Sequence, residues 1–452
     1  NCWHYPLKPV VIHNRVPCMK VLPLFLSVFL VSGCIASAPS VATEPDAIEA
    51  KIIAAVDADQ AHAVALLEKV ININSGTMNF AGVRQVGEVF QAEFDALGFE
   101  TRWIDGEGFD RAGHLVASHG DRGVKVLLIG HLDTVFAPDS PFQRYEPLDG
   151  DRVRGPGITD MKGGDVIIVS ALKALKSAGV LDELSIRVVL MGDEENRGEP
   201  HEIANAALIE AAEWADVAIG FEDGDGNPET IVVSRRGSTS WQLKVSGTPA
   251  HSSQVFQPEV GYGAIYETAR ILDGFRTSLS SEPNLTFNPG VIVGGTDTSL
   301  DEDTSAGTAF GKENVVARSV LVNGDIRALS PEQLVAAKAK MQEIVSAHLA
   351  GTDATLEFSD SYPPLAPSEG NYRLLGMYGA VSQDLGFGPV AAVDPRKAGA
   401  ADISFTSGLV EMAIDGAGLM GWGGHTDDEI ADMTTLPMQS KRAAVLLYRL
   451  NR

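Results

Sequence analysis

The sequence predicts an α/β fold: a mostly parallel sheet with helices on both faces, interrupted by a smaller inserted α+β domain. Short apolar segments alternate with amphipathic helices before residue 236 and again after residue 353, an order typical of parallel sheets with helical crossovers. Between them, segments with alternating apolar and polar residues are typical of a sheet that is exposed on one face. The length of 452 residues suits such a two-domain chain.

The first part of the predicted catalytic α/β domain covers residues 47–236. Apolar residues recur at helical spacing over 48–70 and 83–97, and Gly98 is placed to end the second helix. An apolar run at 124–129 is typical of a strand buried on both faces. The same patterns predict, in chain order, a helix at 163–178, a strand at 184–191, a helix at 201–213 and a strand at 217–221.

Residues 237–352 form the predicted insertion. Apolar residues alternate with polar ones around 241–245, which predicts a half-exposed strand. A helix near 260–275, further strands including 319–327, and a helix at 331–348 follow. This order predicts an α+β, ferredoxin-like domain. Residues 353–452 return to α/β character and end in a helix at 436–450, so we expect them to complete one discontinuous catalytic domain.

Residues 19–33 have the pattern of an export signal. Lys20 precedes an apolar run at 21–31, which is too short to span a bilayer because a spanning helix needs about 20 residues. The sequence VSGC at 31–34 resembles a bacterial lipobox, in which Cys34 would be lipidated; the alternative is a secretory signal that is cleaved after Ala38. We expect residues 1–18 to be translated upstream sequence and 34–46 to be a tether. The predicted location is outside the cytoplasm, as a lipoprotein that faces the periplasm or the cell exterior.

The composition excludes several classes of function. The chain has 60 acidic and 35 basic residues and a net charge of −25, which argues against nucleic-acid binding and leaves a lipid anchor as the expected membrane contact. All three cysteines lie within the first 34 residues, so a disulfide framework and a cysteine nucleophile are both excluded. Any metal site must therefore use histidine and carboxylate side chains.

Acidic and histidine side chains collect where the predicted strands end. They are His131 and Asp133 after 124–129, Asp193, Glu194 and Glu195 after 184–191, and Glu222 after 217–221. Asp160 lies in a glycine-rich loop before the helix at 163–178. Taken singly, each would be a capping or surface residue. Together they should meet at one sheet edge, where several carboxylates repel each other unless cations neutralise them, so a metal site is favoured. His114 has no partner at ligand spacing, and we expect it on the surface.

Four motifs occur in order along the chain: GHLDTV at 130–135, GPGITDMKGG at 155–164, DEE at 193–195 and GHTD at 424–427. Together they resemble those of the dinuclear-zinc M20 peptidase family, and within it the glutamate carboxypeptidase (carboxypeptidase G2-like) branch. The likeness extends from about residue 44 to the end of the chain. It implies two Zn²⁺ ions, which Co²⁺ or Mn²⁺ can replace. The implied ligands are His131 and Glu222 for one ion, Glu195 and His425 for the other, and Asp160 as the bridge between them.

The resemblance also implies roles for neighbouring residues. Asp133 would orient the imidazole of His131, and Glu194 would act as general base rather than as a ligand. The peptide bond between Asp160 and Met161 would be cis.

For the inserted domain, the resemblance implies a lid that also forms a homodimer. His251 would reach across the dimer into the partner's active site, and Asn314 and Arg327 would hold the substrate carboxylate. The simpler alternatives are a turn-capping histidine and an arginine in a strand salt bridge. Residues 296–312 look like an acidic insertion in this lid.

We therefore expect a zinc-dependent exopeptidase or amidohydrolase, in which metal-activated water cleaves the amide bond to the C-terminal amino acid of a peptide or N-acyl amino acid. An N-acyl amino acid deacylase or a dipeptidase acting at the same site is the alternative. A third hypothesis is a solute-binding lipoprotein without catalysis, against which the intact ligand set and Glu194 argue.

Overall fold

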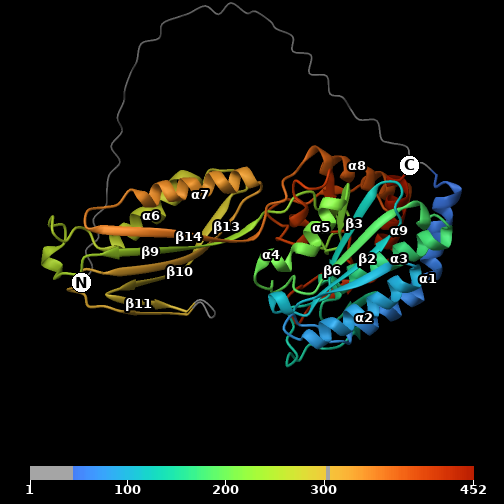
Figure 1. Cartoon of the computed structure of the whole chain (residues 1–452), viewed down its shortest axis with the longest axis horizontal. Coiled ribbons are helices and arrows are strands. Elements are labelled where there is room, and N and C mark those ends of the chain that lie inside the picture. Colours follow the sequence, from blue (N-terminus) through green and yellow to red (C-terminus); the bar gives the residue numbers. More distant parts are fainter. Residues whose placement is uncertain (1–43, 302–305) are drawn as a thin grey trace, which may run out of the picture. The chain divides into compact units, whose positions relative to one another are not determined.

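A six-stranded sheet forms the centre of the α/β part of the chain (Figure 1). The computed structural model describes residues 44–301 and 306–452, so the predicted export signal and Cys34 lie outside the described residues. In spatial order the strands are β1 (Glu100–Asp105), β2 (Gly113–His119), β6 (Ser185–Met191), β3 (Lys125–His131), β7 (Val217–Gly220) and β16 (Met412–Ile414). Strands β6, β3, β7 and β16 run parallel to one another, and β2 runs antiparallel to both of its neighbours, β1 and β6. The prediction of a mostly parallel sheet is confirmed.

Helices cover both faces of this sheet. The helices on the first face are α1 (Ala47–Ile71), α2 (Phe80–Leu97), α3 (Gly163–Ala178), α8 (Glu369–Asp384) and α9 (Thr435–Leu450). The second face packs against α5 (Ala206–Trp214), which follows the short α4 (His201–Ala204), and against a 3-10 turn at Asp402–Thr406. Along β3, Val126 and Leu128 point into the first core and Leu127 and Ile129 into the second. Both faces of this strand are buried, which explains its continuous apolar run.

Capping residues fix the start of α1 and the end of α2. The carboxylate of Asp46 accepts the backbone N–H groups of Ile48 and Glu49, and Glu49 accepts the N–H of Asp46 in return. This capping box begins α1. Helix α2 ends at Gly98, whose φ of 88° is readily adopted only by glycine.

A small antiparallel sheet connects two distant parts of the catalytic domain. Its strands, in spatial order, are β17 (Gly421–Trp422), β18 (Ile430–Asp432), β5 (Arg152–Arg154) and β4 (Glu146–Pro147). Strand β18 pairs with β5, and the N–H of Gly155 donates to the carbonyl of Glu429 at 3.2 Å. The loop between β17 and β18 is therefore held beside the loop that follows β5. A separate parallel pair is formed by β8 (Thr230–Ile231) and β15 (Ala391–Ala392).

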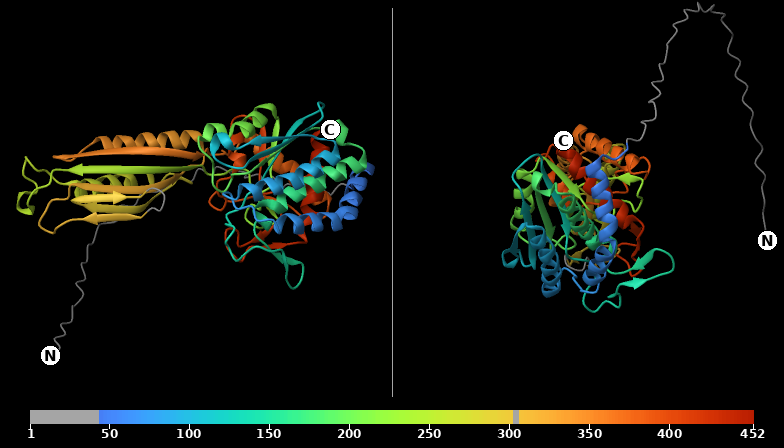
Figure 2. Two further views of the ribbon diagram at one scale, coloured as in Figure 1. Left: turned by 60° about the horizontal axis from the view of Figure 1, so that its bottom comes forward. Right: turned by 90° about the vertical axis from the view of Figure 1, so that its right-hand side faces the viewer.

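The inserted region is built on a four-stranded antiparallel sheet. Its strands, in spatial order, are β10 (Thr286–Gly295), β13 (Ser319–Arg327), β9 (Ser238–Gly247) and β14 (Thr352–Tyr362). Helices α6 (Ala264–Leu279) and α7 (Pro331–Ser346) cover one face of this sheet (Figures 1 and 2). The chain order of these strands and helices is the ferredoxin-like one that the sequence predicts.

The pairing of β14 corrects the predicted end of the insertion. Strand β14 lies beside β9 along most of its length, with Leu356 opposite Leu243. Its inward residues, such as Leu356, alternate with exposed polar ones such as Glu357, the pattern of a sheet that is open on one face. Residues 353–362 therefore belong to the sheet of the insertion, whose boundary moves from 352 to about 362.

The predicted insertion at 296–312 contains a β-hairpin. Its strands are β11 (Asp297–Leu300) and β12 (Gly307–Phe310), and residues 302–305 between them lie outside the described residues. The hairpin lies on the sheet face opposite α6 and α7 (Figures 1 and 2), where Gly307 sits against the side chain of Val293.

Among the helices that the structure describes, none combines the length and the apolar character needed to cross a bilayer.

Candidate metal centre and active site

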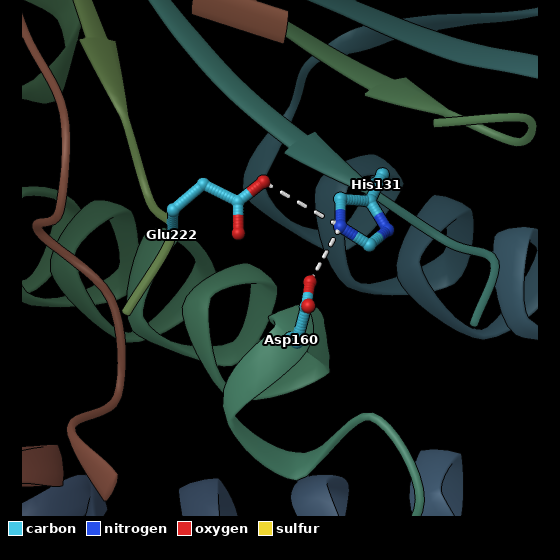
Figure 3. A group of neighbouring side chains, drawn as sticks. All are labelled: His131, Asp160 and Glu222. Atoms are coloured by element: carbon cyan, nitrogen blue, oxygen red, sulfur yellow. Dashed lines mark hydrogen bonds and ion pairs between the residues drawn. The ribbon is translucent and has the colours of Figure 1, made fainter. Parts of the chain in front are cut away.

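Three ligand-type side chains converge at the carboxyl ends of two neighbouring strands (Figure 3). His131 is the last residue of β3, Glu222 follows β7, and Asp160 lies in a turn at Ile158–Lys162. Nε2 of His131 is 3.1 Å from Oδ1 of Asp160 and 3.5 Å from Oε1 of Glu222. The imidazole is buried, and both carboxylates point to the same ring nitrogen.

A second group of three shares Asp160 with the first. Nε2 of His425 is 2.9 Å from Oδ2 of Asp160 and 3.1 Å from Oε2 of Glu195. Glu195 comes from the segment after β6, and His425 from the loop between β17 and β18. The two oxygens of Asp160 are thus divided between the two imidazoles, as a bridging carboxylate requires.

These donors fit two divalent metal ions. In each group, one ligand atom from each of the three residues lies within 4.8 Å of the others. Oε1 of Glu195 is buried and has no hydrogen-bond partner within the described residues, so it is free to bind a cation. One imidazole and two carboxylates, one of them shared, are the ligand types found at zinc sites that keep a position open for water or substrate.

The electrostatics of the five side chains also favour cations. Hydrogen bonds to Asp160 and Glu195 raise the pKa of His425 to about 11. Burial, followed by the charge of Asp160, raises the pKa of Glu222 to about 7. Burial alone would raise the pKa of Asp160 as well, but hydrogen bonds from the two histidines bring it below its ordinary value. Protons and metal ions compete for these ligands.

The turn that presents Asp160 is held by a residue that the sequence did not single out. The buried carboxylate of Glu429 accepts the backbone N–H groups of Gly157 and Thr159, both at 2.8 Å, and of Asp160 at 3.2 Å. Glu429 lies four residues after His425, so one segment supplies a ligand and also fixes the loop of another. Burial raises the pKa of Glu429 to about 7. The Asp160–Met161 peptide bond is cis, as the resemblance implied.

Asp133 links His131 to the segment after β6. Its Oδ1 is 3.5 Å from Nδ1 of His131. The same oxygen accepts the N–H of Glu194 at 3.0 Å, and Oδ2 accepts the N–H of Glu195 at 3.1 Å and the hydroxyl of Thr77 at 2.6 Å. Asp133 therefore positions three site residues at once.

Glu194 lies within a hydrogen-bonded network that the sequence also did not predict. The hydroxyl of Tyr362 contacts Oε1 of Glu194 at 3.0 Å and its carbonyl at 2.8 Å, and it receives an N–H from Arg197 at 2.9 Å. Arg197 also pairs with Asp193 and Asp402. Because Arg197 donates to the Tyr362 oxygen, the hydroxyl proton is left for Glu194. Burial raises the pKa of Glu194 well above its ordinary value, and nearby carboxylates including Asp402 raise it further.

The three site residues expected in the inserted domain are not brought to this cluster. His251 is exposed, and its Nδ1 is 2.8 Å from the hydroxyl of Ser253. The carbonyl of Asn314 accepts the N–H of Ser252. Arg327 pairs with Asp325 at 3.0 Å. Within the described residues, none of the three has a hydrogen bond or ion pair to a metal-ligand side chain, and these local contacts match the simpler alternatives.

The expectation that His114 lies on the surface is wrong. It sits in β2 and is fully buried, stacked on Phe109 with ring centroids 4.9 Å apart. Its Nδ1 accepts the N–H of Gly192 at 3.1 Å, and its Nε2 lies 2.9 Å from the carbonyl of Ala204. Burial lowers its pKa. His114 thus acts as a neutral bridge between β2 and the segments flanking Glu194.

Several known proteins are similar to this chain in sequence, in fold, or in both. Carboxypeptidase G2 from Pseudomonas sp. (strain RS-16) is 28% identical over 396 residues, covering 87% of this chain and 90% of the relative. A succinyl-diaminopimelate desuccinylase from Acidiphilium cryptum (strain JF-5) is 28% identical over 252 residues, 53% of this chain and 61% of the relative. The crystal structure of aminopeptidase PepT from Bacillus cereus ATCC 10987 aligns with a TM-score of 0.68 over 87% of this chain and 99% of its own, at 19% identity.

The model of peptidase family M20/M25/M40 matches residues 127–449, which is most of the chain. That segment contains both groups of ligands and Glu194. The chain therefore belongs to peptidase family M20/M25/M40 and is a metal-dependent hydrolase of peptide or related amide bonds.

Proposed function

We propose that the protein is a di-zinc exopeptidase that releases the C-terminal residue from a peptide or an N-acyl amino acid. The observation that carries this proposal is the pair of histidine–carboxylate groups that share Asp160, with the carboxylate of Glu194 beside them. The similarity to carboxypeptidase G2 over 87% of the chain supports cleavage at the C-terminal side.

His131, Asp160 and Glu222 would hold one ion, and Asp160, Glu195 and His425 the other. When bound, the ions would polarise the scissile carbonyl and lower the pKa of water.

Glu194 is the carboxylate beside the two ligand groups that is not itself one of the proposed metal ligands, so we assign proton transfer to it. It accepts a proton from the attacking water and returns it to the leaving nitrogen, so that the amide bond breaks with a neutral amine as product. The hydroxyl of Tyr362 and the N–H bond to Asp133 fix its position. General acid–base groups of this kind contribute about 10²–10⁴-fold to rates.

The test combines metal analysis with hydrolysis. We expect two zinc ions per chain in wild type and in Glu194→Ala, with kcat at least about 10²-fold lower in the variant. Glu88→Ala, which changes an exposed glutamate on α2, is the matched control and should behave as wild type. A zinc content near zero, or an unchanged kcat in Glu194→Ala, would contradict the proposal.

An N-acyl amino acid deacylase or dipeptidase is the second candidate, and the desuccinylase relative favours it. The two functions use the same metal ligands and differ in the part of the substrate that the protein recognises. Rates for N-acyl-glutamates, free dipeptides and folate-type conjugates separate them. A carboxypeptidase requires the free carboxylate of the released residue and accepts a blocked amino group on the acyl side, whereas a dipeptidase also requires the free amino group.

We further propose that the protein forms a homodimer through the inserted domain. Exposed apolar side chains gather around the start of α6 and on the edge strand β10: Phe256, Tyr262, Ile265, Tyr266 and Ile292. An edge strand with an apolar surface is a natural site for pairing with a second copy. In the dimer His251 would act in the partner's site. Mixing Glu194→Ala with His251→Ala chains should then restore part of the activity, and no recovery in proven heterodimers would exclude this role.

Export and lipid anchoring at Cys34 are also proposals, supported by the sequence at 19–34. Labelling of cells with a radioactive fatty acid should mark the wild-type protein. The Cys34→Ala variant should lose the label and leave the membrane fraction. A variant that stays membrane-bound would argue against the anchor.

A further inference from the structure

A hollow of about 250 Å³ opens directly beside the metal ligand Glu195. Four apolar residues contribute to its lining, namely Met78, Val135, Ala137 and Pro138, and Asn196 lines it next to Glu195. Met78 and Val135 are 57% and 40% exposed. Two large apolar side chains are thus left in contact with solvent at the edge of the metal centre, where a ligand can cover them.

The backbone of this hollow is already fixed. Gly76 and Thr134 pair as a parallel bridge, and the N–H of Thr77 donates to the carbonyl of Thr134 at 3.1 Å. The amide of Asn74 donates to the carbonyl of Phe136 at 3.0 Å. A side chain on Gly76 would collide with that same carbonyl. Because the backbone groups are satisfied by one another, the wall offers few polar partners to a ligand and presents mainly carbon.

Hydrogen bonds also connect the lining of the hollow to Glu194 and Glu195. The hydroxyl of Thr77 donates to Asp133 at 2.6 Å, and Asp133 accepts the N–H groups of both Glu194 and Glu195. Met78 and Val135 follow Thr77 and Thr134 in the sequence. A group seated in the hollow is therefore held at a fixed place relative to the general base and one metal ligand.

We propose that this hollow is the subsite for an uncharged, apolar group on the acyl side of the scissile amide. The proposal rests on the proposed function, in which the released group is a C-terminal residue with a free carboxylate. Because the described lining of the hollow offers that carboxylate no basic side chain, we assign the hollow to the other, acyl side of the amide. The volume is below the range of about 300–1,000 Å³ that holds a whole drug-sized ligand, so it suits one side chain or a short acyl chain. The described residues that line it include no lysine, arginine or histidine, so an anionic acyl group would lack a partner there.

The experiment measures kcat/KM for acetyl, butanoyl, hexanoyl, benzoyl and succinyl derivatives of one amino acid, with the zinc-loaded wild-type protein. We expect a rise of about fourfold for each methylene that becomes buried, equivalent to about 0.8 kcal/mol. The succinyl derivative should react more slowly than the butanoyl derivative, which has the same chain length without the second carboxylate.

Variants show whether this preference arises in the hollow. Met78→Ala and Val135→Ala should flatten the dependence on acyl length, and Met78→Lys should raise the rate for succinyl relative to butanoyl. Val335→Ala is the matched control, because it makes the same change at an exposed valine on α7 and should keep the wild-type dependence.

A second measurement does not depend on turnover. In Met78→Cys combined with Glu194→Ala, which keeps the derivatives from being consumed, iodoacetamide labelling can be followed by mass spectrometry of the peptide that contains position 78. The hexanoyl derivative should slow labelling more than the acetyl derivative does.

The outcomes are distinct. No turnover of any derivative by zinc-loaded wild type would contradict the proposed function itself. Turnover without dependence on acyl length, or a dependence that Met78→Ala and Val135→Ala leave intact, would overturn the subsite alone. Equal labelling of position 78 with every derivative would also overturn it.

Discussion

Tyr362 shows how a residue outside the ligand set can serve the reaction. Its hydroxyl accepts an N–H from Arg197, and its single proton is shared between the backbone carbonyl of Glu194 at 2.8 Å and the carboxylate of the same residue at 3.0 Å. Removing the hydroxyl leaves the ring packed near Phe405 and frees the Glu194 carboxylate to rotate.

We predict that Tyr362→Phe lowers kcat by about tenfold, the equivalent of one hydrogen bond of about 1.5 kcal/mol, with little change in KM. Zinc content and Tm should stay near the wild-type values, which separates a positioning role from general destabilisation. Tyr372→Phe, at an exposed tyrosine on α8, serves as control. An unchanged kcat would show that Glu194 does not need this contact.

Glu429 acts on the metal centre through the backbone of the Asp160 turn. We predict that Glu429→Gln binds the metal about 10-fold to 100-fold more weakly, the range seen when residues behind metal ligands are changed. The amide keeps the size of the side chain but has one oxygen in place of two, so it cannot accept all three N–H groups. Competition with a chelator measures the loss, and Glu343→Gln on α7, an exposed position, should show none. Equal affinities would contradict this role.

Among single residues, the sequence predicted the candidate metal ligands much better than the residues that hold them in position. His131, Asp160, Glu195 and His425 stand in motifs, Glu222 directly follows an apolar strand, and the structure places all five together. Tyr362, Arg197 and Glu429 act through contacts between segments far apart in the chain, and no spacing rule reveals such contacts.

Among the secondary-structure elements, the strands that present the site were the easiest to predict. Strands β3, β6 and β7 are buried on both faces, so their apolar runs are continuous. Strands β1 and β14 have exposed residues along their length, and their weaker alternation gives no comparable signal. The same weakness placed the end of the insertion at 352 instead of about 362.

Helix α6 carries a buried acid, Glu267, which we expect to make the stability of the inserted domain depend on pH. Glu267 is fully buried in its first turn and accepts hydrogen bonds from Arg270 at 2.6 and 3.0 Å and from the N–H of Leu349 at 3.1 Å. His348 also faces it, at 3.7 Å. Burial alone would raise the pKa of Glu267, but these hydrogen bonds lower it below its ordinary value.

A carboxylate whose pKa is lower in the folded state stabilises the protein above the unfolded pKa of about 4.3, and this contribution is lost as the pH falls through the folded pKa. We predict that Glu267→Gln destabilises the protein at pH 7 and that the difference from wild type shrinks as the pH falls below about 4. Urea unfolding at several pH values measures it, with Glu343→Gln as control. A difference that does not vary with pH would contradict this account.

At the scale of the whole molecule, the candidate metal centre brings together segments that follow different secondary-structure elements. Its ligands follow β3, β6 and β7, lie in the Asp160 turn, and include the β17–β18 loop. Without bound cations the shared carboxylates repel one another.

We predict that chelation lowers Tm by several degrees, because binding at a thousandfold excess over Kd contributes about 4 kcal/mol to the folded state. Adding zinc back should restore both Tm and activity. The His425→Ala variant keeps the first group of ligands and should retain about half of the metal with a smaller shift. Calorimetry with metal analysis measures both, and a Tm that is indifferent to chelation would show that the metal does not stabilise the fold.

The discontinuous α/β domain was predictable because the pattern of apolar and polar residues changes at both ends of the insertion. The hairpin of β11 and β12 was foreseen only as an acidic insertion, since its exposed residues have no apolar periodicity. The proximity of His131 to His425, almost 300 residues later in the chain, was predicted from the resemblance in sequence motifs and not from any local pattern.

Asp160 is shared by two ligand groups that the ribosome does not finish at the same time. The first group is complete once Glu222 has been synthesised, whereas the second awaits His425, after the whole inserted domain and most of the C-terminal segment. Glu429, which holds the Asp160 turn, lies in the same late segment as His425. We therefore expect a chain that ends before residue 425 to lack one ligand of the second group and the support of the shared carboxylate, and to show no hydrolase activity.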